Sequence, residues 1–303
     1  MPMHQLTIDS FLGRARSEVQ EIGAEHGDAL CFIIDQARQP DALARLYGLG
    51  QPLEPTNLFL GTEFEALAEQ GPIWIGGGIT PDLKALAADL CIERNAGICL
   101  LTSDVQQALT HARWLLKAYD GSGGQSILSY CRAELWAALA STAKMASSQL
   151  MGPWSAVLSP APKHVGADSK RWIMWSSASK SPVDSESPHF NLPRDCSAAQ
   201  RLFAWVYWVD EHFQYFGKPQ CESLQQIVTN LMFLADNRIT QGRHLLKLSP
   251  LIRSSLIQAR PDVMEVLVSN DPAFLKVQKL NSLPFAPKNA ASVQDEWSHH
   301  GTC

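Results

Sequence analysis

Apolar runs of strand length alternate with helical patterns along residues 29–140, and this alternation limits the possible folds more than any other feature of the sequence. Residues 29–35 form a short continuous apolar run that ends in a polar residue, which is the pattern of a strand buried on both faces. Residues 97–101 form a second such run. Strands that alternate with helices are typical of an α/β domain. The sequence therefore predicts an α/β domain over residues 1–160.

Two of the predicted helices begin at clear capping signals. Thr80 and Pro81 combine a hydroxyl N-cap with proline at the first helical position. Ser103 and Gln106 have the spacing of a capping box. Residues 6–23 are predicted to form the first helix of the chain.

The character of the sequence changes after residue 160. Prolines punctuate a polar stretch, which predicts a Pro/Ser-rich linker over residues 161–195 with an edge strand at residues 172–175. From residue 196 onward the pattern is helical, and residues 197–216 are predicted to form one continuous helix. Residues 196–303 are therefore predicted to be a helical domain with a frayed tail.

Composition and charge exclude several classes of protein. The chain has 303 residues, of which 46% are hydrophobic and 18% charged, and this predicts globular domains rather than disorder. The net charge is −5, and without a basic stripe no nucleic-acid partner is expected. No run approaches the roughly 18 consecutive apolar residues of a membrane span, and residues 1–16 lack a signal-peptide pattern. Seven cysteines without a C-x-x-C pair favour reduced thiols in a cytoplasmic protein, with no metal.

Several groups of residues could carry chemistry. Gly76–Gly78 follows a strand and precedes a helix, where a phosphate-binding loop would lie, but no Lys-Ser or Lys-Thr follows and the G-x-G-x-x-G spacing is not met. A flexible connector is favoured, and a small-molecule or nucleotide-binding α/β enzyme using this loop remains the alternative. The consecutive residues Asp210, Glu211 and His212 point about 100° apart on a helix, which favours helix surface over a metal site.

Asp35 ends a strand, where α/β folds often place catalytic groups. No base or nucleophile can be named to act with it, so a structural turn residue is favoured. The sequence thus predicts no catalytic residue and no cofactor.

The helix around Trp205 is the most informative feature of the second half. Trp205, Trp208, His212 and Tyr215 recur at helical spacing and form a stripe beside a second, aliphatic one. One interpretation is a central helix that is packed on two sides. The other is a partner-binding surface, because Trp and Tyr dominate interface hot spots.

Five blocks in a fixed order carry a resemblance to a known family. They are residues 30–37, 58–75, 98–116, 130–139 and 150–154. The series resembles the domain of unknown function 4123 family, whose members are known as type VI secretion effector chaperones or adaptors. One block departs from the family, because Tyr130, Cys131 and Arg132 stand where relatives have an Asp-Pro step. The role of the family's Asp–Arg pairing therefore stays open here.

The resemblance implies a non-catalytic bacterial adaptor that works in the cytoplasm. Its expected partners are a cognate toxic effector and the VgrG-type spike protein onto which the effector is loaded. The aromatic stripe is the expected effector-binding surface. A self-associating structural protein without an effector is a further alternative.

Overall fold

The computed structural model of this protein describes residues 8–16, 28–119, 124–143, 147–165, 171–176 and 189–283. The chain divides into two compact units, Met1–Glu211 and His212–Cys303. The division falls at the end of helix α8 (Cys196–Glu211), so this helix belongs to the first unit. The sequence had instead placed the start of the helical domain at residue 196.

The first unit is built on a seven-stranded sheet in the order β1-β9-β8-β5-β2-β4-β3. Its strands are β1 (Ala15–Arg16), β2 (Ala29–Ile34), β3 (Thr56–Asn57), β4 (Ile73–Gly76), β5 (Gly97–Thr102), β8 (Trp154–Pro160) and β9 (Trp172–Ser176). The predicted mixture of strands and helices, followed by a helical C-terminal region, is present. Every neighbouring pair in this sheet is antiparallel, although helices separate several of the strands along the chain.

A second, small sheet has the order β10-β6-β7. Its strands are β6 (Lys117–Tyr119), β7 (Gln125–Ile127) and β10 (Phe190–Asn191). β10 pairs with β6 in parallel, and β7 pairs with β6 antiparallel. The predicted linker therefore contributes strands to both sheets, through β9 and β10.

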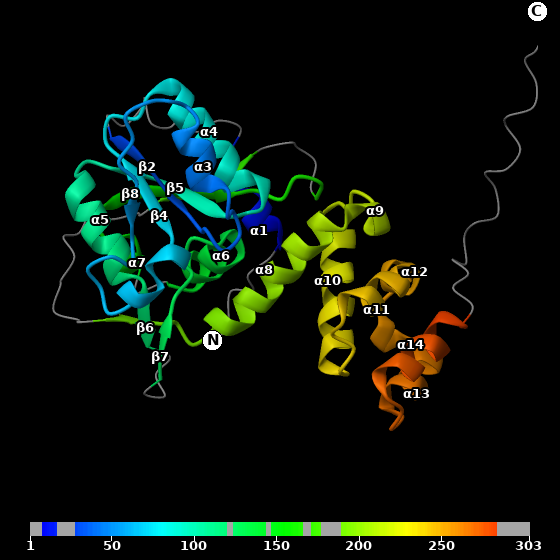
Figure 1. The fold of residues 1–303 in the computed structure, drawn as a ribbon. Coiled ribbons are helices and arrows are strands. Elements are labelled where there is room, and N and C mark those ends of the chain that lie inside the picture. Colours follow the sequence, from blue (N-terminus) through cyan, green and yellow to red (C-terminus); the bar gives the residue numbers. More distant parts are fainter. Residues whose placement is uncertain are drawn as a thin grey trace, which may run out of the picture. The chain divides into compact units, whose positions relative to one another are not determined.

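Helices α3 (Ala42–Tyr47) and α4 (Pro81–Glu93) cover one face of the large sheet (Figure 1). Alternate residues of β2 and β5 point to this face, and Phe32 and Leu101 lie in one buried cluster with Leu46 and Leu90 from the helices. All six residues of β5 are buried. The prediction of centrally buried strands is thus confirmed for β2 and β5.

The opposite face is covered by α5 (Val105–Trp114) and α6 (Ala133–Thr142), which meet at Trp154. The register of β8 against β5 shifts between Leu101 and Thr102. The side chains of Trp154 and Ala156 therefore point to opposite faces of the sheet. The Trp154 indole Nε1–H donates to the Ala108 carbonyl of α5 at 3.4 Å, and its ring lies 5.8 Å from that of Trp136 in α6. A one-residue bulge therefore directs the largest side chain of β8 into the second core.

Helices α1 (Ile8–Leu12) and α8 extend this second core. The ring of Phe11 in α1 lies 4.7 Å from Phe203 of α8 and 6.3 Å from Trp175 of β9. α8 packs along α6. α8 also reaches the end of β8 directly, because its Tyr207 hydroxyl donates to the Pro160 carbonyl.

Three local predictions were wrong. The helix predicted over residues 6–23 ends at Leu12, and the chain continues as β1. Because β1 pairs with β9, the segment predicted as an edge strand lies inside the sheet. The N-cap of α5 is Asp104 and not Ser103, since the Asp104 carboxylate accepts from the N–H groups of Gln106 and Gln107. The N-cap of α4 is Thr80, as predicted.

In the part of the second unit that the structure describes, every regular element is a helix. They are α9 (Phe213–Phe216), α10 (Cys221–Asp236), α11 (Gly242–Lys247), α12 (Ser249–Ser254), the short 3-10 helix η3 (Ile257–Ala259), α13 (Pro261–Val268) and α14 (Ala273–Asn281). The buried Asn230 of α10 donates to the carbonyls of Ile252 and Ser255 and accepts from the N–H of Ile257. This one side chain fixes the turn between α12 and η3 against α10. The remaining short elements, both in the first unit, are η1 (Glu65–Gln70) and α7 (Ser147–Met151).

Within the described ranges, no helix combines the length and the apolar character that a membrane crossing requires.

Gly152 and His111 illustrate how tightly the second core is packed. His111 is buried, and its Nε2 lies 3.0 Å from the Leu150 carbonyl. Because a carbonyl oxygen only accepts, Nε2 carries a proton. Burial lowers the pKa of His111 to about 4, against the opposing effect of this hydrogen bond. Gly152 has φ +51°, and a Cβ at this position would lie 2.5–2.7 Å from three atoms of the His111 ring.

Replacing Gly152 with alanine should destabilise the protein by about 3 kcal/mol, because a left-handed backbone and an overpacked contact each cost roughly 1–2 kcal/mol. The matched control is Gly50→Ala, since Gly50 has φ +64° and no atom within 4 Å of an added Cβ. This control should cost about 1 kcal/mol, from the backbone alone. Urea denaturation measures both values. Equal losses for the two variants would contradict the close approach of His111 to residue 152.

Acid should destabilise the protein through His111. Because its pKa is about 4 in the folded protein and 6.5 in the reference state, the unfolded chain binds the proton more tightly between these pH values. The contribution is complete above pH 6.5 and decreases as the pH falls towards 4, by about 3 kcal/mol in total. Urea denaturation from pH 7 to pH 4, compared between the wild type and His111→Gln, isolates this contribution. Equal pH dependence in both proteins would show that His111 does not supply it.

Candidate functional site

Asp35 and Arg132 form an ion pair that joins the end of β2 to the start of α6. The Arg132 Nε–H donates to Asp35 Oδ2 at 2.9 Å. The other oxygen, Oδ1, accepts from the N–H of Ala37 at 3.0 Å. The Asp35 side chain is only 6% exposed. The predicted role of Asp35 as a structural turn residue is confirmed, and its partner is the arginine of the block that departs from the family pattern.

A second ion pair lies beside the first. Arg38, in the turn that follows Asp35, donates through both terminal nitrogens to the two carboxylate oxygens of Glu134 in α6. The same guanidinium donates to the Asn95 carbonyl at 3.1 Å, which ties the α4–β5 turn to the pair. Two arginine–carboxylate pairs thus hold the start of α6 against the C-terminal end of β2.

Asp210 fixes a loop to α8. Its buried carboxylate accepts from the backbone N–H groups of Lys163, His164 and Val165. One turn earlier, the Tyr207 hydroxyl donates to the Pro160 carbonyl. Burial raises the pKa of Tyr207 well above its ordinary value, so the hydroxyl keeps its proton. The interpretation of residues 210–212 as plain helix surface was therefore wrong for Asp210.

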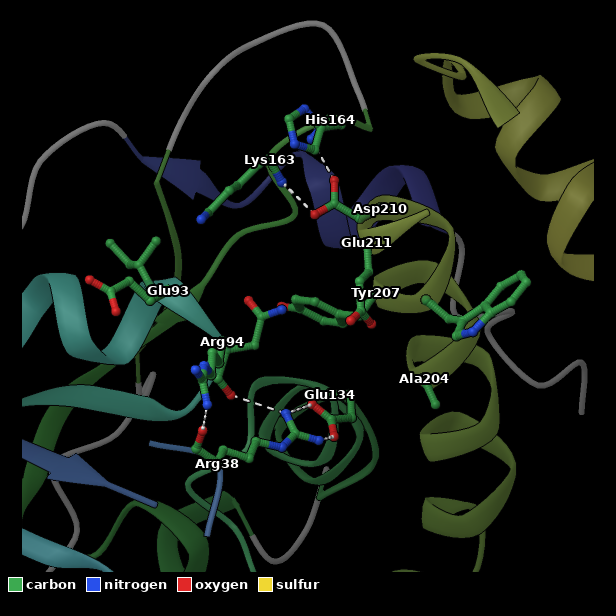
Figure 2. Close-up of a pocket in the computed structure, with 13 residues that line it drawn as sticks. Arg38, Glu93, Arg94, Glu134, Lys163, His164, Ala204, Tyr207, Asp210 and Glu211 are labelled. Atoms are coloured by element: carbon green, nitrogen blue, oxygen red, sulfur yellow. Dashed lines mark hydrogen bonds and ion pairs between the residues drawn. The ribbon is translucent and has the colours of Figure 1, made fainter. Parts of the chain in front are cut away.

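These elements border a cavity of about 660 Å³ that is open to solvent (Figure 2). Its walls come from the end of α4 and the turn after it, from α6, from the loop at residues 163–164 and from α8. The lining residues are Arg38, Ile92, Glu93, Arg94, Asn95, Glu134, Lys163, His164, Ala204, Tyr207, Trp208, Asp210 and Glu211. Figure 2 shows Glu93 and Arg94 on one side, Tyr207, Asp210 and Glu211 on the other, and Lys163 on the loop above. A polar cavity with one aromatic wall suits binding of a ligand or peptide.

The four residues predicted to bind a partner do not form one continuous helical stripe. α8 ends at Glu211, and His212 precedes the separate helix α9. Trp205 and Trp208 lie on α8, where both are half-buried and their rings meet edge to face at a centroid distance of 5.4 Å. His212 and Tyr215 belong to the second unit, and Tyr215 is exposed. Of the four, only Trp208 lines the cavity.

The Gly76–Gly78 loop is a connection between β4 and α4. Gly77 and Gly78 have φ +75° and +58°, and an added Cβ at either position would meet no atom within 4 Å. The N-terminus of α4 is capped by the Thr80 hydroxyl. The loop does not contribute to the cavity described above.

Among the described residues, no group of three or more histidine, cysteine or acidic side chains is placed to hold a metal ion. Five of the described cysteines, Cys31, Cys91, Cys99, Cys131 and Cys196, are buried free thiols. Burial raises their pKa values, which keeps them protonated and unreactive.

A comparison with known families found a match for part of the first unit. Residues 31–150 match the family described as Domain of unknown function (DUF4123). This part of the chain belongs to the DUF4123 family. The comparisons with curated proteins and with solved structures gave no match. Arg38, Arg94 and Glu134 lie inside the DUF4123 match, whereas Lys163 and α8 follow it. One wall of the cavity is therefore family sequence, and the other is supplied by the chain beyond the family match.

Sequence reasoning did not find the cavity. Arg94, Lys163 and Tyr207 carry no motif, and they come from a turn, a loop and a helix that are far apart in the sequence. Asp210 gave the one available signal, because it follows Val206 and Tyr207 at i+4 and i+3 spacing, so an acidic residue stands on an otherwise apolar face of the helix. Only the fold shows that it binds backbone N–H groups.

Removing the arginine of the first ion pair should cost about 2–3 kcal/mol, because Arg132→Gln leaves the buried Asp35 carboxylate without its charged partner. The control is Arg171→Gln, since Arg171 pairs with Asp89 and both side chains are about half exposed, at 52% and 51%. This exposed pair should contribute no more than about 0.5 kcal/mol. Urea denaturation of both variants tests the difference, and a loss below about 1 kcal/mol for Arg132→Gln would contradict the role given to the pair.

Proposed function

We propose that this protein is a non-catalytic type VI secretion adaptor, which binds a cognate toxic effector in the cytoplasm and helps to load it onto a VgrG-type spike protein. The DUF4123 match supports a link to type VI effectors at the level of the family. The observation that carries the proposal for this chain is the pair Trp205 and Trp208. Two half-buried indoles meet on one helix beside a cavity, and such aromatic residues are enriched in interface hot spots.

The position of α8 also supports a binding function. α8 follows the family match directly after the segment at residues 161–195, and its inner face packs on α6. Its buried residues include Phe203, Val206 and Val209, which leaves Trp205 and Trp208 partly accessible. A helix that is anchored on one face and aromatic on another can bind a partner without disturbing the core.

The first test is co-expression with the proteins encoded beside it, followed by tagged pull-down and mass spectrometry. Stoichiometric capture of one neighbouring toxin or spike protein is expected. The variant Trp205→Ala/Trp208→Ala should reduce effector recovery by at least about tenfold, since each hot-spot residue contributes more than about 1 kcal/mol. Its thermal midpoint should stay close to that of the wild type.

The matched control is Tyr47→Ala, because Tyr47 is an aromatic residue of α3 that is 56% exposed and does not line the cavity. This variant should capture the effector as the wild type does. Unfolding of the double tryptophan variant would show that the indoles are core residues, and recovery of the wild-type protein alone would contradict the adaptor proposal.

A further inference from the structure

Most acidic side chains of the cavity already have partners within the protein. Glu134 is bound by both terminal nitrogens of Arg38. Glu93 accepts from both terminal nitrogens of Arg45, at 2.7 and 2.9 Å, and this contact lowers the pKa of Glu93. Asp210 is surrounded by backbone N–H groups. These carboxylates have little capacity left to attract a ligand.

Two cations of the cavity are not paired in this way. Arg94 donates to the Arg38 carbonyl at 3.1 Å and forms no ion pair with a described residue. The Lys163 ammonium has no hydrogen bond or ion pair to any residue that the structure describes, although its backbone N–H is held by Asp210. Glu211 is the one lining acid without such a partner in the described chain. The remaining hydrogen-bonding capacity is thus mainly that of donors, which favours a ligand rich in acceptors.

The α8 wall has an apolar part beside its two acids. Ala204, Tyr207 and Trp208 share one face of α8 at i, i+3 and i+4 spacing, and Ile92 lines the cavity from the end of α4. Because the Tyr207 hydroxyl is engaged with Pro160, its ring contributes apolar surface only. A volume of about 660 Å³ lies within the range of pockets that hold a drug-sized ligand, which is also the size of a short peptide segment.

We infer that this cavity binds an extended acidic segment of the effector, with carboxylates at Lys163 and Arg94 and an apolar side chain against Tyr207 and Trp208. The inference rests on the proposed adaptor function and adds the chemistry that is recognised. Lys163 and α8 follow the family match, whereas Arg94 lies within it. The site is therefore shared between the family match, which supplies Arg94, and the chain beyond it, which supplies Lys163, Tyr207 and Trp208.

A library of random peptides displayed on phage, selected against the purified full-length protein, tests this chemistry directly. The enriched peptides should be acidic and should carry at least one large apolar residue. Their affinity should fall about tenfold for Lys163→Glu/Arg94→Glu, because two attractive contacts become repulsive, and should be kept by Lys163→Arg/Arg94→Lys. Glu211→Gln should raise the affinity about twofold, because it removes a like charge from the site.

Selection of basic or neutral peptides, or of acidic peptides whose binding is unchanged by Lys163→Glu/Arg94→Glu, would overturn the inference. Inorganic phosphate is the probe for a small free anion. Saturable phosphate binding with the same response to the variants, without enrichment of acidic peptides, would show that the cavity is a small-anion site instead.

The pull-down experiment separates this inference from the proposed function. Capture of an effector by the wild type and equally by Lys163→Glu/Arg94→Glu would leave the adaptor function standing and remove the acidic-segment inference. Enrichment of acidic peptides without capture of any effector would support the acidic-segment inference and contradict the adaptor function.

Discussion

The fold depends on two central strands that have no solvent-facing side. β5 is buried along its whole length, and the last four residues of β2 are buried as well. Each large apolar side chain that is buried contributes about 1.5–3 kcal/mol, so the chain must supply helices for both faces of the sheet. α3 and α4 cover one face, and α5 and α6 cover the other. An antiparallel sheet can leave one face in water, but the sequence of these strands does not permit it.

The arginine–carboxylate pairs connect this sheet to the candidate site. Asp35 and Arg38 follow β2 directly, and their partners Arg132 and Glu134 stand at the start of α6. Because α8 packs on α6, these two ion pairs also determine where α8 lies relative to the α4–β5 turn. The cavity therefore has a rigid wall that is fixed by the family core. The loop at residues 163–164 forms a second wall, and hydrogen bonds of Asp210 and Tyr207 of α8 hold this loop and the preceding Pro160 in place.

This arrangement separates a shared scaffold from an individual surface. The DUF4123 match covers most of β2, the strands β3 to β7, the two ion pairs and α6, and it ends before β8, Lys163, Trp205 and Trp208. Under the proposed adaptor function, the loop at residue 163 and α8, which lie beyond the family match, supply much of the partner-binding surface. The missing Asp-Pro step beside Tyr130 does not remove the pairing of Arg132, because its carboxylate comes from Asp35. The Tyr130 hydroxyl donates to the Ala112 carbonyl of α5, so this residue also keeps a structural contact.

The sequence by itself determined the elements with strong local signals. Continuous apolar runs predicted β2 and β5, the Thr80-Pro81 step predicted the start of α4, and the ordered blocks predicted the family. These predictions succeed because the burial pattern of a strand and the capping of a helix depend on residues that are close together in the sequence. Only the tertiary structure decided the antiparallel pairing, the inclusion of α8 in the first unit and the meeting of Arg94, Lys163 and Trp208 around one cavity. The physical reason is that pairing and enclosure depend on contacts between distant segments, which leave no periodic trace in the sequence of either segment.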